Sequence, residues 1–402
     1  MKITQALLAL ALTWVVSSAL FQGCATTIPG MSFEERTVGL YVNGTELYKK
    51  GKYIQAIYLL KQAIDFNPKF AEAYYVLGLT YIKTKDYEQA IEMLQKASKL
   101  ELTLDEPAFT EADIKFNIGL AYLGMKDYEK ARASIEEALE LKPDFAEAHY
   151  NLAYVAEKMG DNQSAIAYLK NALEADSTMD KAYVALGIFY KKEGDLETAR
   201  AQLQKAIRIN RQNKEAYNEL GKLFVESGDF ETAVRYFRRA IQLDREYTEA
   251  YVNLGAAYLE MESLDRARNA FQQALKIDST YTDAYIRLAQ VHFMSGDTSA
   301  ALSTYEKVLE LEPQRSGVNH QIALILEQQG RLEEAVAALR RELSIDPDNA
   351  ASHFDLAVLL HKLGRIEEAL AEYRTYVELM PPDDEKARKV RAILERLEKV
   401  NN

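Results

Sequence analysis

The sequence predicts an all-α fold organised as a solenoid, because one module of 34 residues recurs ten times within the 402-residue chain. In every copy position 20 of the module is alanine, position 8 is glycine or alanine, and position 24 is large and apolar or aromatic. Residues three and four apart share a helix face, so positions 4, 7, 8 and 11 form one stripe and positions 20, 24 and 27 form another. Each copy is therefore expected to contain two amphipathic helices. The alanines at position 20 are Ala56, Ala90, Ala131, Ala165, Ala199, Ala233, Ala267, Ala301, Ala335 and Ala369.

Turn residues separate the two helices of a copy and close it. Position 15 is glycine in seven copies, as at Gly228, where the end of a helix favours a left-handed residue. Proline stands at position 32 in five copies, as at Pro313, and it cannot continue a helix interior. Each copy is thus a helix, a turn, a second helix and a second turn. The copies start at residues 37, 71, 112, 146, 180, 214, 248, 282, 316 and 350.

This pattern resembles the tetratricopeptide repeat family over residues 37–383. The copy "AYNELGKLFVESGDFETAVRYFRRAIQLD" carries nearly the whole family pattern, at Tyr217, Leu220, Gly221, Phe224, Gly228, Phe230, Ala233, Phe237 and Ala240. The resemblance implies a right-handed α-α superhelix of about ten helix-turn-helix units, with units 1–2 over residues 37–104 and units 3–10 over residues 112–383. It also implies that the first helices line a concave groove that binds other proteins or peptides.

The array has two departures from its period. Residues 105–111, "DEPAFTE", are inserted between copies two and three, and Thr110 with Asp113 is typical of a new helix N-cap. The insertion is interpreted as a longer loop, with a hinge or a partner contact as the alternative. Position 27 is alanine in the first seven copies but becomes Val308, Glu342 and Tyr376 in the last three, so the packing there must loosen or rearrange.

Residues 384–402 are predicted to form one more helix. Val390, Ile393, Leu394 and Leu397 lie on one face of it and charged residues on the other. Such a helix is expected to cap the last copy, because the terminal unit of a solenoid needs a polar outer surface. A tail that binds a partner is the alternative.

Residues 1–23 predict a secretory signal. Lys2 precedes an apolar run from Ala6 to Leu20. This run is shorter than the roughly 20 residues of a membrane-spanning helix, which favours cleavage over a permanent span.

Cys24 is the only cysteine of the chain and follows this segment directly. The arrangement resembles a bacterial lipoprotein signal, in which the cysteine is lipidated and residues 24–36 form the attachment site and a spacer. Gly23 fits that motif, whereas Phe21 and Gln22 depart from it. By resemblance to enterobacterial sorting, Ala25 implies the periplasmic face of the outer membrane. An ordinary cleaved signal peptide and an uncleaved anchor are the alternatives.

Composition and motifs argue against several functions. With 49 basic and 61 acidic residues the net charge is −12, and no basic stripe favours nucleic acid. The five histidines form no pair at metal-ligand spacing on one helix face, and three occupy packing positions of the repeat. No nucleophile elbow, phosphate loop or dinucleotide loop stands in a suitable context. We therefore expect no enzyme, no metal, no cofactor and no small-molecule substrate.

The candidate binding surface follows from the family resemblance, which implies that positions 2, 5, 9 and 12 line the groove. In the first four copies these positions include six aromatic residues, and copies five and six offer a local basic patch. The alternative is that the tyrosines pack on one another inside a tight superhelix. The groove candidates are Tyr41, Tyr48, Tyr75, Phe116, Tyr150, Tyr154, Lys181, Lys191, Asn218 and Lys222.

Position 6 adds Asn117, Asn151 and Asn253 to these candidates. An asparagine ladder at this position resembles the groove of protein O-linked N-acetylglucosamine transferases, which grips the backbone of a peptide. Ala185 and Glu219 interrupt the ladder here. The resemblance therefore implies peptide binding only.

Together these observations predict a non-catalytic scaffold that is anchored to the outer membrane by lipid alone. It is expected to bind peptide segments of envelope proteins and to assist the assembly of a secretion or pilus complex. Two alternatives stay open: a peptide-binding subunit that works with a separate glycosyltransferase, and a passive structural spacer.

Overall fold

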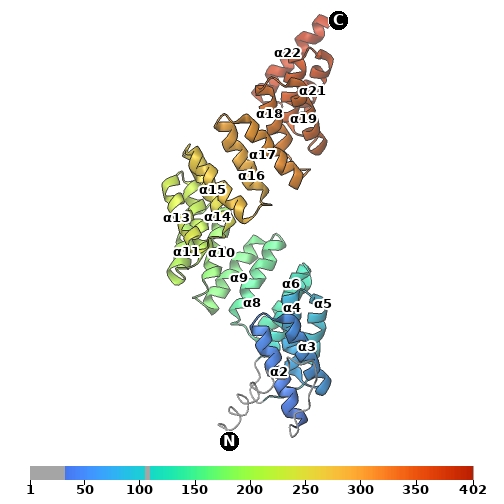
Figure 1. Cartoon of the computed structure of the whole chain (residues 1–402), viewed down its shortest axis with the longest axis vertical. Coiled ribbons are helices and arrows are strands. Elements are labelled where there is room, and N and C mark those ends of the chain that lie inside the picture. Colours follow the sequence, from blue (N-terminus) through green and yellow to red (C-terminus); the bar gives the residue numbers. More distant parts are fainter. Residues whose placement is uncertain (1–31, 105–108, 402) are drawn as a thin grey trace. The chain divides into compact units, whose positions relative to one another are not determined.

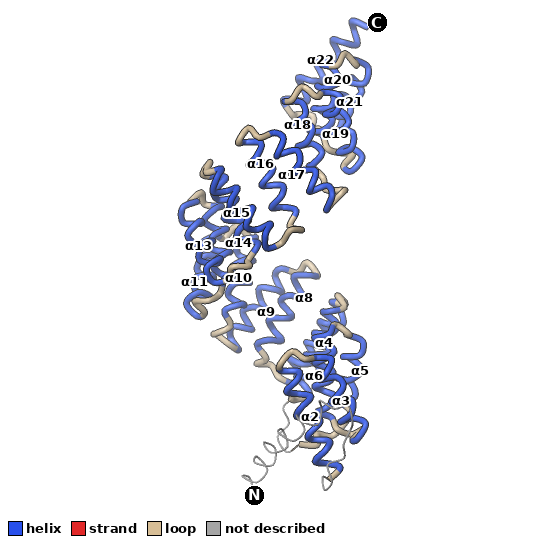
Figure 2. Tube along the Cα trace, viewed as in Figure 1, coloured by secondary structure: helices blue, strands red, loops and turns tan. Residues whose placement is uncertain are grey.

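The computed structural model describes residues 32–104 and 109–401, and these residues form helices joined by short loops without any strand (Figures 1 and 2). The predicted all-α fold is confirmed. The predicted signal and Cys24 lie outside the described part. The same holds for residues 105–108 of the insertion and for the side chains of Ile393 and Leu397. None of the helices described is long and apolar enough to cross a membrane. The chain divides into two units, of which the first ends at Ile209 and the second begins at Asn210.

Unit 1 contains five helix pairs that correspond to the first five copies. In each pair the first and second helix pack along each other, and successive pairs stack in chain order. The pairs are α2 (Phe33–Lys49) with α3 (Tyr53–Phe66), α4 (Ala71–Thr84) with α5 (Tyr87–Ser98), α6 (Glu111–Gly124) with α7 (Tyr128–Leu141), α8 (Ala146–Lys158) with α9 (Asn162–Ala175), and α10 (Asp180–Lys192) with α11 (Leu196–Ile209).

Unit 2 contains the other five pairs and a final helix. The pairs are α12 (Lys214–Glu226) with α13 (Phe230–Leu243), α14 (Thr248–Glu260) with α15 (Leu264–Ile277), α16 (Thr282–Met294) with α17 (Thr298–Leu311), α18 (Val318–Gln328) with α19 (Leu332–Ile345), and α20 (Ala350–Lys362) with α21 (Ile366–Leu379). The last helix is α22 (Glu385–Asn401), whose residues Ala387, Val390 and Leu394 pack against Leu370 and Tyr376 of α21.

Small residues bring the two helices of each pair into close contact. All ten alanines at position 20 are buried, with at most 2 % of their surface exposed. In the six copies with glycine at position 8, a methyl group there would lie 2.4 to 2.8 Å from the side chain at position 24. No carbon atom tolerates such a distance, so the residue pair 8 and 24 sets how closely the helices approach.

The turn between paired helices requires a left-handed residue. All seven glycines at position 15 have positive φ, from 73° at Gly51 to 83° at Gly160. Where the sequence lacks glycine at this position, Lys85, Lys126 and Glu262 take positive φ as well. The geometry of the hairpin therefore overrides the preference of the residue.

The connection between α5 and α6, which contains the insertion, is anchored near both of its ends. Oε1 of Glu72 accepts hydrogen bonds from the backbone N–H groups of Thr103, at 2.8 Å, and Leu104, at 2.7 Å. Glu72 itself is fully buried in α4. At the other end Thr110 and Asp113 form the predicted capping box of α6. The three substitutions of alanine at position 27 are all buried, so the packing there rearranges rather than loosens.

We predict that Gly221→Ala destabilises unit 2 by about 1–2 kcal/mol, because the strain of the new methyl group against fully buried Phe237 exceeds the gain in helix propensity. Gly39→Ala is the matched control, since nothing lies within 4 Å of a methyl group at this helical position. Thermal unfolding followed by circular dichroism should show a lower midpoint for Gly221→Ala only. Equal midpoints for both variants would show that the close approach is absent.

We predict that Glu72→Ala releases the segment after α5, because two backbone N–H groups lose a buried carboxylate acceptor. Each lost hydrogen bond to a charged group corresponds to about 1.5–3 kcal/mol, so protection of the Thr103 and Leu104 amides against hydrogen exchange should fall by at least about tenfold. Glu88→Ala, at an exposed site in the first turn of α5, is the control and should leave this protection unchanged. Unaltered exchange in Glu72→Ala would contradict the anchoring role.

Candidate functional site

The candidate residues lie on the first helices of the pairs, and the structure divides them into buried and accessible groups. Tyr41 and Phe116 are 8 % and 9 % exposed. The ring centroid of Tyr41 lies 5.1 Å from that of Phe70, and Phe116 lies 4.8 Å from Phe145. The expectation that these two aromatic residues offer surface to a partner is wrong. Position 5 packs against the last loop residue before the next first helix, a contact that helical periodicity does not reveal.

Tyr75 is also covered, in this case by the insertion. Its ring stacks on Phe109 with centroids 4.0 Å apart and planes 14° from parallel. Asn117 Nδ2 donates to the Tyr75 hydroxyl at 3.2 Å and to the Asp113 carbonyl at 2.7 Å. Burial raises the pKa of Tyr75 well above its ordinary value, with the Asp113 carboxylate adding to the effect. Tyr75 is therefore engaged within the chain, although its ring packs on a phenylalanine and not on another tyrosine as the alternative had it.

Tyr48 is half-buried beside Tyr53, with ring centroids 6.1 Å apart. Burial raises its pKa, and the neighbouring Tyr53 acts in the same direction. In its exposure Tyr48 is therefore intermediate between the covered and the accessible candidates.

An accessible aromatic and basic surface lies on α8 and α10. Tyr154 is 45 % exposed, and Lys158 Nζ lies 5.0 Å from the centre of its ring. Tyr150 is half-buried, and the exposed Lys181 places Nζ 4.5 Å from its ring centre. We call Tyr150, Tyr154, Lys158 and Lys181 the Tyr154 patch. Lys158 was not among the candidates, because position 13 is not one of the family's groove positions.

Two further candidates accompany the Tyr154 patch. Asn151 Nδ2 donates to the Glu147 carbonyl at 2.7 Å, one turn back on α8. Lys191 is half-buried on α10. Near it, Lys192 Nζ pairs with Glu157 at 2.9 Å and links α10 to α8. Because Glu157 pairs with Lys192, it does not neutralise the positive charge of Lys158 and Lys181 at the patch.

The candidates of unit 2 belong to a polar network rather than to a basic patch. Lys222 Nζ lies 2.6 Å from Glu219 Oε1 and 2.5 Å from Glu249 Oε1. Burial lowers the pKa of Lys222, but the two carboxylates outweigh burial and the net pKa is raised. The positive charge is thus retained and neutralised locally. The expectation of a basic surface at Lys222 is wrong.

Two asparagines complete this network. Asn218 is fully buried, its Nδ2 donates to Glu249 Oε1 at 3.2 Å, and its Oδ1 accepts from Asn253 Nδ2 at 3.0 Å. The expectation that Asn218 lies on the groove surface is therefore wrong. The Nδ2 groups of Asn117, Asn151 and Asn253 all make intramolecular hydrogen bonds, so the asparagines of position 6 do not form a ladder of unengaged donors.

Three of the five histidines lie within hydrogen-bonding distance of partners inside the repeat array. His149 and His353, both at position 4, place Nε2 2.9 Å and 3.0 Å from the carbonyl oxygens of Pro143 and Pro347. His320 Nε2 lies 2.7 Å from Asp355 Oδ2. No group of three histidine, cysteine, aspartate or glutamate side chains in the described residues could hold a metal ion.

Comparison with known proteins finds repeat families along most of the chain. A family model described as the C-terminal domain of cilia and flagella-associated protein 70 matches residues 181–393, more than half of the 402 residues. Models described as tetratricopeptide repeats match residues 44–85, 69–144 and 116–180. No curated protein matches.

Several solved structures are similar to this chain. One is MamA, with 27 % identity over 41 % of this chain and 97 % of that chain and a TM-score of 0.38. Another is pilF of Pseudomonas aeruginosa, with 20 % identity over 50 % of this chain and 92 % of that chain and a TM-score of 0.46. A third is yeast Tom70, with 17 % identity over 92 % and 97 % and a TM-score of 0.49.

One family model covers more than half of the chain, and three repeat models cover the copies before it. The chain belongs to the tetratricopeptide repeat family.

Proposed function

We propose that this protein is a non-catalytic scaffold that binds a peptide segment of another protein at the Tyr154 patch. The observation that carries the proposal is the exposure of Tyr154, at 45 %, on the first helix of its copy, whereas Tyr41 and Phe116 on the first helices of other copies are buried. Tyrosine combines a large apolar ring with a polar tip and is enriched at protein interfaces. An exposed tyrosine with a lysine over its ring is therefore surface suited to a partner.

The chemistry of the patch defines the kind of segment it would hold. Lys158 and Lys181 carry positive charge on a chain with a net charge of −12, and neither forms an ion pair among the described residues. Their positions over the tyrosine rings, at 5.0 and 4.5 Å, hold them in place by cation–π interactions of about 0.5–1 kcal/mol each. A segment with apolar side chains for the rings and acidic side chains for the lysines would complement this surface.

The cellular setting of the proposal rests on the sequence. The apolar run before Cys24 supports an exported lipoprotein whose cysteine carries the lipid anchor at the periplasmic face of the outer membrane. A triacylated cysteine is a firm tether, because more than one acyl chain is needed for stable anchoring. We propose that the partners are envelope proteins, and that the scaffold assists assembly of a secretion or pilus complex.

The two alternatives have less support. The first alternative, a peptide-binding subunit of a separate glycosyltransferase, was suggested by the asparagines of position 6. The side-chain amides of Asn117, Asn151 and Asn253 instead form hydrogen bonds within the chain. A passive spacer would be expected to present a featureless first-helix face. The Tyr154 patch argues against that expectation.

Binding at the patch is tested by the double variant Tyr154→Ala with Lys181→Glu, which removes an aromatic anchor and reverses a charge. Losing an anchor costs about 2 kcal/mol or more, so partner recovery by crosslinking and affinity capture from native cells should fall by at least about tenfold. The control is Tyr58→Ala with Lys52→Glu, at exposed residues of the first copy. If both double variants capture the same proteins as the unaltered chain, the patch is not the binding site.

Lipid attachment is tested separately by expressing the chain with a clickable fatty acid in a bacterial host. The unaltered protein should carry the label and sediment with membranes, whereas Cys24→Ser should lose the label because the chain has no other cysteine. Thr27→Ser is the control and should retain the label. An unlabelled wild-type protein would refute lipidation without affecting the assignment of the Tyr154 patch.

A further inference from the structure

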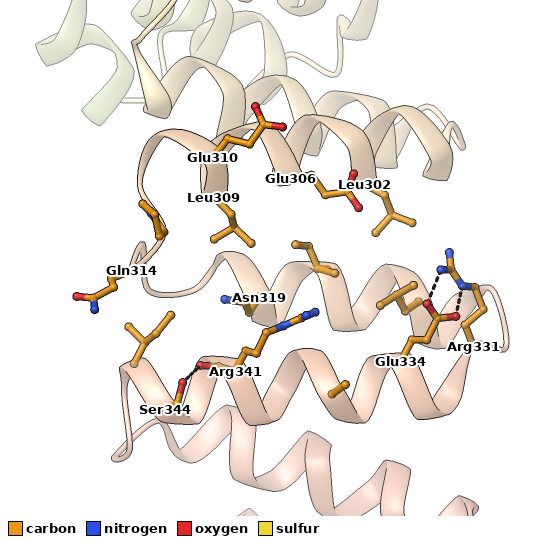
Figure 3. Close-up of a pocket in the computed structure, with 15 residues that line it drawn as sticks. Leu302, Glu306, Leu309, Glu310, Gln314, Asn319, Arg331, Glu334, Arg341 and Ser344 are labelled. Atoms are coloured by element: carbon orange, nitrogen blue, oxygen red, sulfur yellow. Dashed lines mark hydrogen bonds and ion pairs between the residues drawn. The ribbon is translucent and has the colours of Figure 1, made fainter.

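A cleft of about 1000 Å³ lies in unit 2 between the second helices α17 and α19, with α18 beneath it (Figure 3). Leu302 and Leu309 of α17 and Ile322 and Leu326 of α18 contribute apolar surface to it. Pro313 lines the end of the cleft where α17 leads into α18. This site lies on different helices from the Tyr154 patch, so the inference goes beyond the proposed function.

Irregular residues of the ninth copy account for the opening. The first helices of copies four to eight and of copy ten begin at position 1, whereas α18 begins only at Val318, position 3, after Gly317 with a φ of 85°. Glu342, which replaces alanine at position 27, fixes this late start because its Oε1 accepts from the Gly317 N–H at 2.5 Å and the Ser316 hydroxyl at 3.0 Å. Within unit 2, α17 and α18 contact each other less than the other consecutive repeats do.

A recurring side-chain pair is broken at the same place. In three copies a basic residue at position 26 lies over the tyrosine at position 4 of the same copy, with the cation 5.6 to 5.9 Å from the ring centre. The ninth copy retains the basic residue, Arg341, but has Asn319 where the tyrosine would stand. No ion pair or cation–π contact of the described residues involves Arg341. Its side chain extends from α19 into the space between α17 and α19 (Figure 3). The three intact pairs are Tyr74 with Lys96, Tyr183 with Lys205, and Tyr217 with Arg239.

Asn319 fills less space than the tyrosine found at this position in other copies, and its side-chain oxygen has no hydrogen-bond donor. It is 2 % exposed, yet its Oδ1 has no hydrogen-bond partner. Elsewhere the polar tip at position 4 reaches the carbonyl oxygen six residues earlier, as from Tyr285 to Ser279 at 3.4 Å and from His353 to Pro347 at 3.0 Å. The shorter asparagine makes no such bond to Pro313. Buried polar atoms are normally satisfied, so an orphaned acceptor at the base of a cleft points to a missing donor.

We propose that this cleft binds a tyrosine-bearing helical segment of a partner protein. The incoming ring takes the place that tyrosine occupies at position 4 of other copies, beneath the guanidinium of Arg341. Its hydroxyl supplies the donor that Asn319 Oδ1 lacks. The partner thereby completes, between two chains, the cation–π pair that three copies form within themselves.

The walls of the cleft define the rest of the segment. Asn319, Ile322 and Leu326 follow a spacing of three and then four residues along α18, which suits the apolar stripe of a second helix. Glu306 on α17 faces Arg341 on α19 across the opening (Figure 3). A segment with a basic residue on the edge toward α17 therefore matches the charge of that wall. At the other end Arg331 and Glu334 pair with each other at 2.7 Å.

The test is a selection from a displayed library of helical peptides, each about 14 residues long to match α17, against the full chain. Enriched peptides should carry tyrosine on the apolar face and a basic residue on one edge. Replacing that tyrosine by alanine should weaken binding by at least about tenfold, as expected of an anchor residue. If no peptide is enriched, or if the enriched peptides lack an aromatic anchor, the inference is overturned.

Two variants of the chain locate the binding. Asn319→Tyr restores the residue of other copies, so it should fold at least as stably as the parent and weaken peptide binding by at least about tenfold. Arg341→Gln, at an exposed position, should weaken binding by about three- to tenfold. Unchanged affinity in either variant would contradict the inference, and Arg341→Gln decides it if Asn319→Tyr does not fold. Tyr154→Ala is the control and should bind as the parent does.

Self-association is distinguished by size-exclusion chromatography with light scattering. The parent and Asn319→Tyr should have the same mass at all concentrations without peptide. A concentration-dependent oligomer that Asn319→Tyr abolishes would mean that a second copy of this chain occupies the cleft, and that a partner protein does not.

Discussion

The close contact between the two helices of each pair is the constraint on which the rest of the structure depends. Glycine at position 8 leaves no room for a methyl group against the side chain at position 24, and alanine at position 20 is buried in every copy. Because each hairpin buries its stripe against itself and its neighbours, stability is distributed along the array. Surface residues are then free to vary from copy to copy, and this variation creates the distinct patches of the molecule.

Periodicity was sufficient to predict the helices, their order and their turns. The glycines of position 15 predicted the left-handed turn correctly, and the turn keeps that geometry at Lys126, where no glycine marks it. The capping box at Thr110 was predicted because both of its partners lie three residues apart in sequence. Local signals of this kind depend on short-range geometry, which a single sequence contains.

The candidate site was predicted less well, because its accessibility depends on contacts between copies. Tyr41 is buried against Phe70 and Tyr75 is partly covered by Phe109, and neither contact follows from the position of a residue within one module. The sequence predicted that Lys222 contributes to a basic surface. Glu249 from the next copy forms an ion pair with it and neutralises its charge. Glu72, which holds the backbone of Thr103 and Leu104 after α5, carried no sequence signal, since an acidic residue in the first turn of a helix is ordinary. Tyr154 is the aromatic candidate that the structure leaves exposed, at 45 %.

The central claim is that ten hairpins pack in register through positions 8, 20 and 24. Native-state hydrogen exchange resolved to single amides measures this most directly, because amides in packed helices open only with their cooperative unit. If the hairpins pack in this way, amides should exchange slowly around position 20 in each of the ten copies, at Ala56, Ala90 and every 34 residues from Ala131 to Ala369. Fast exchange around the position 20 alanines of several copies would mean that the hairpins do not pack in this way.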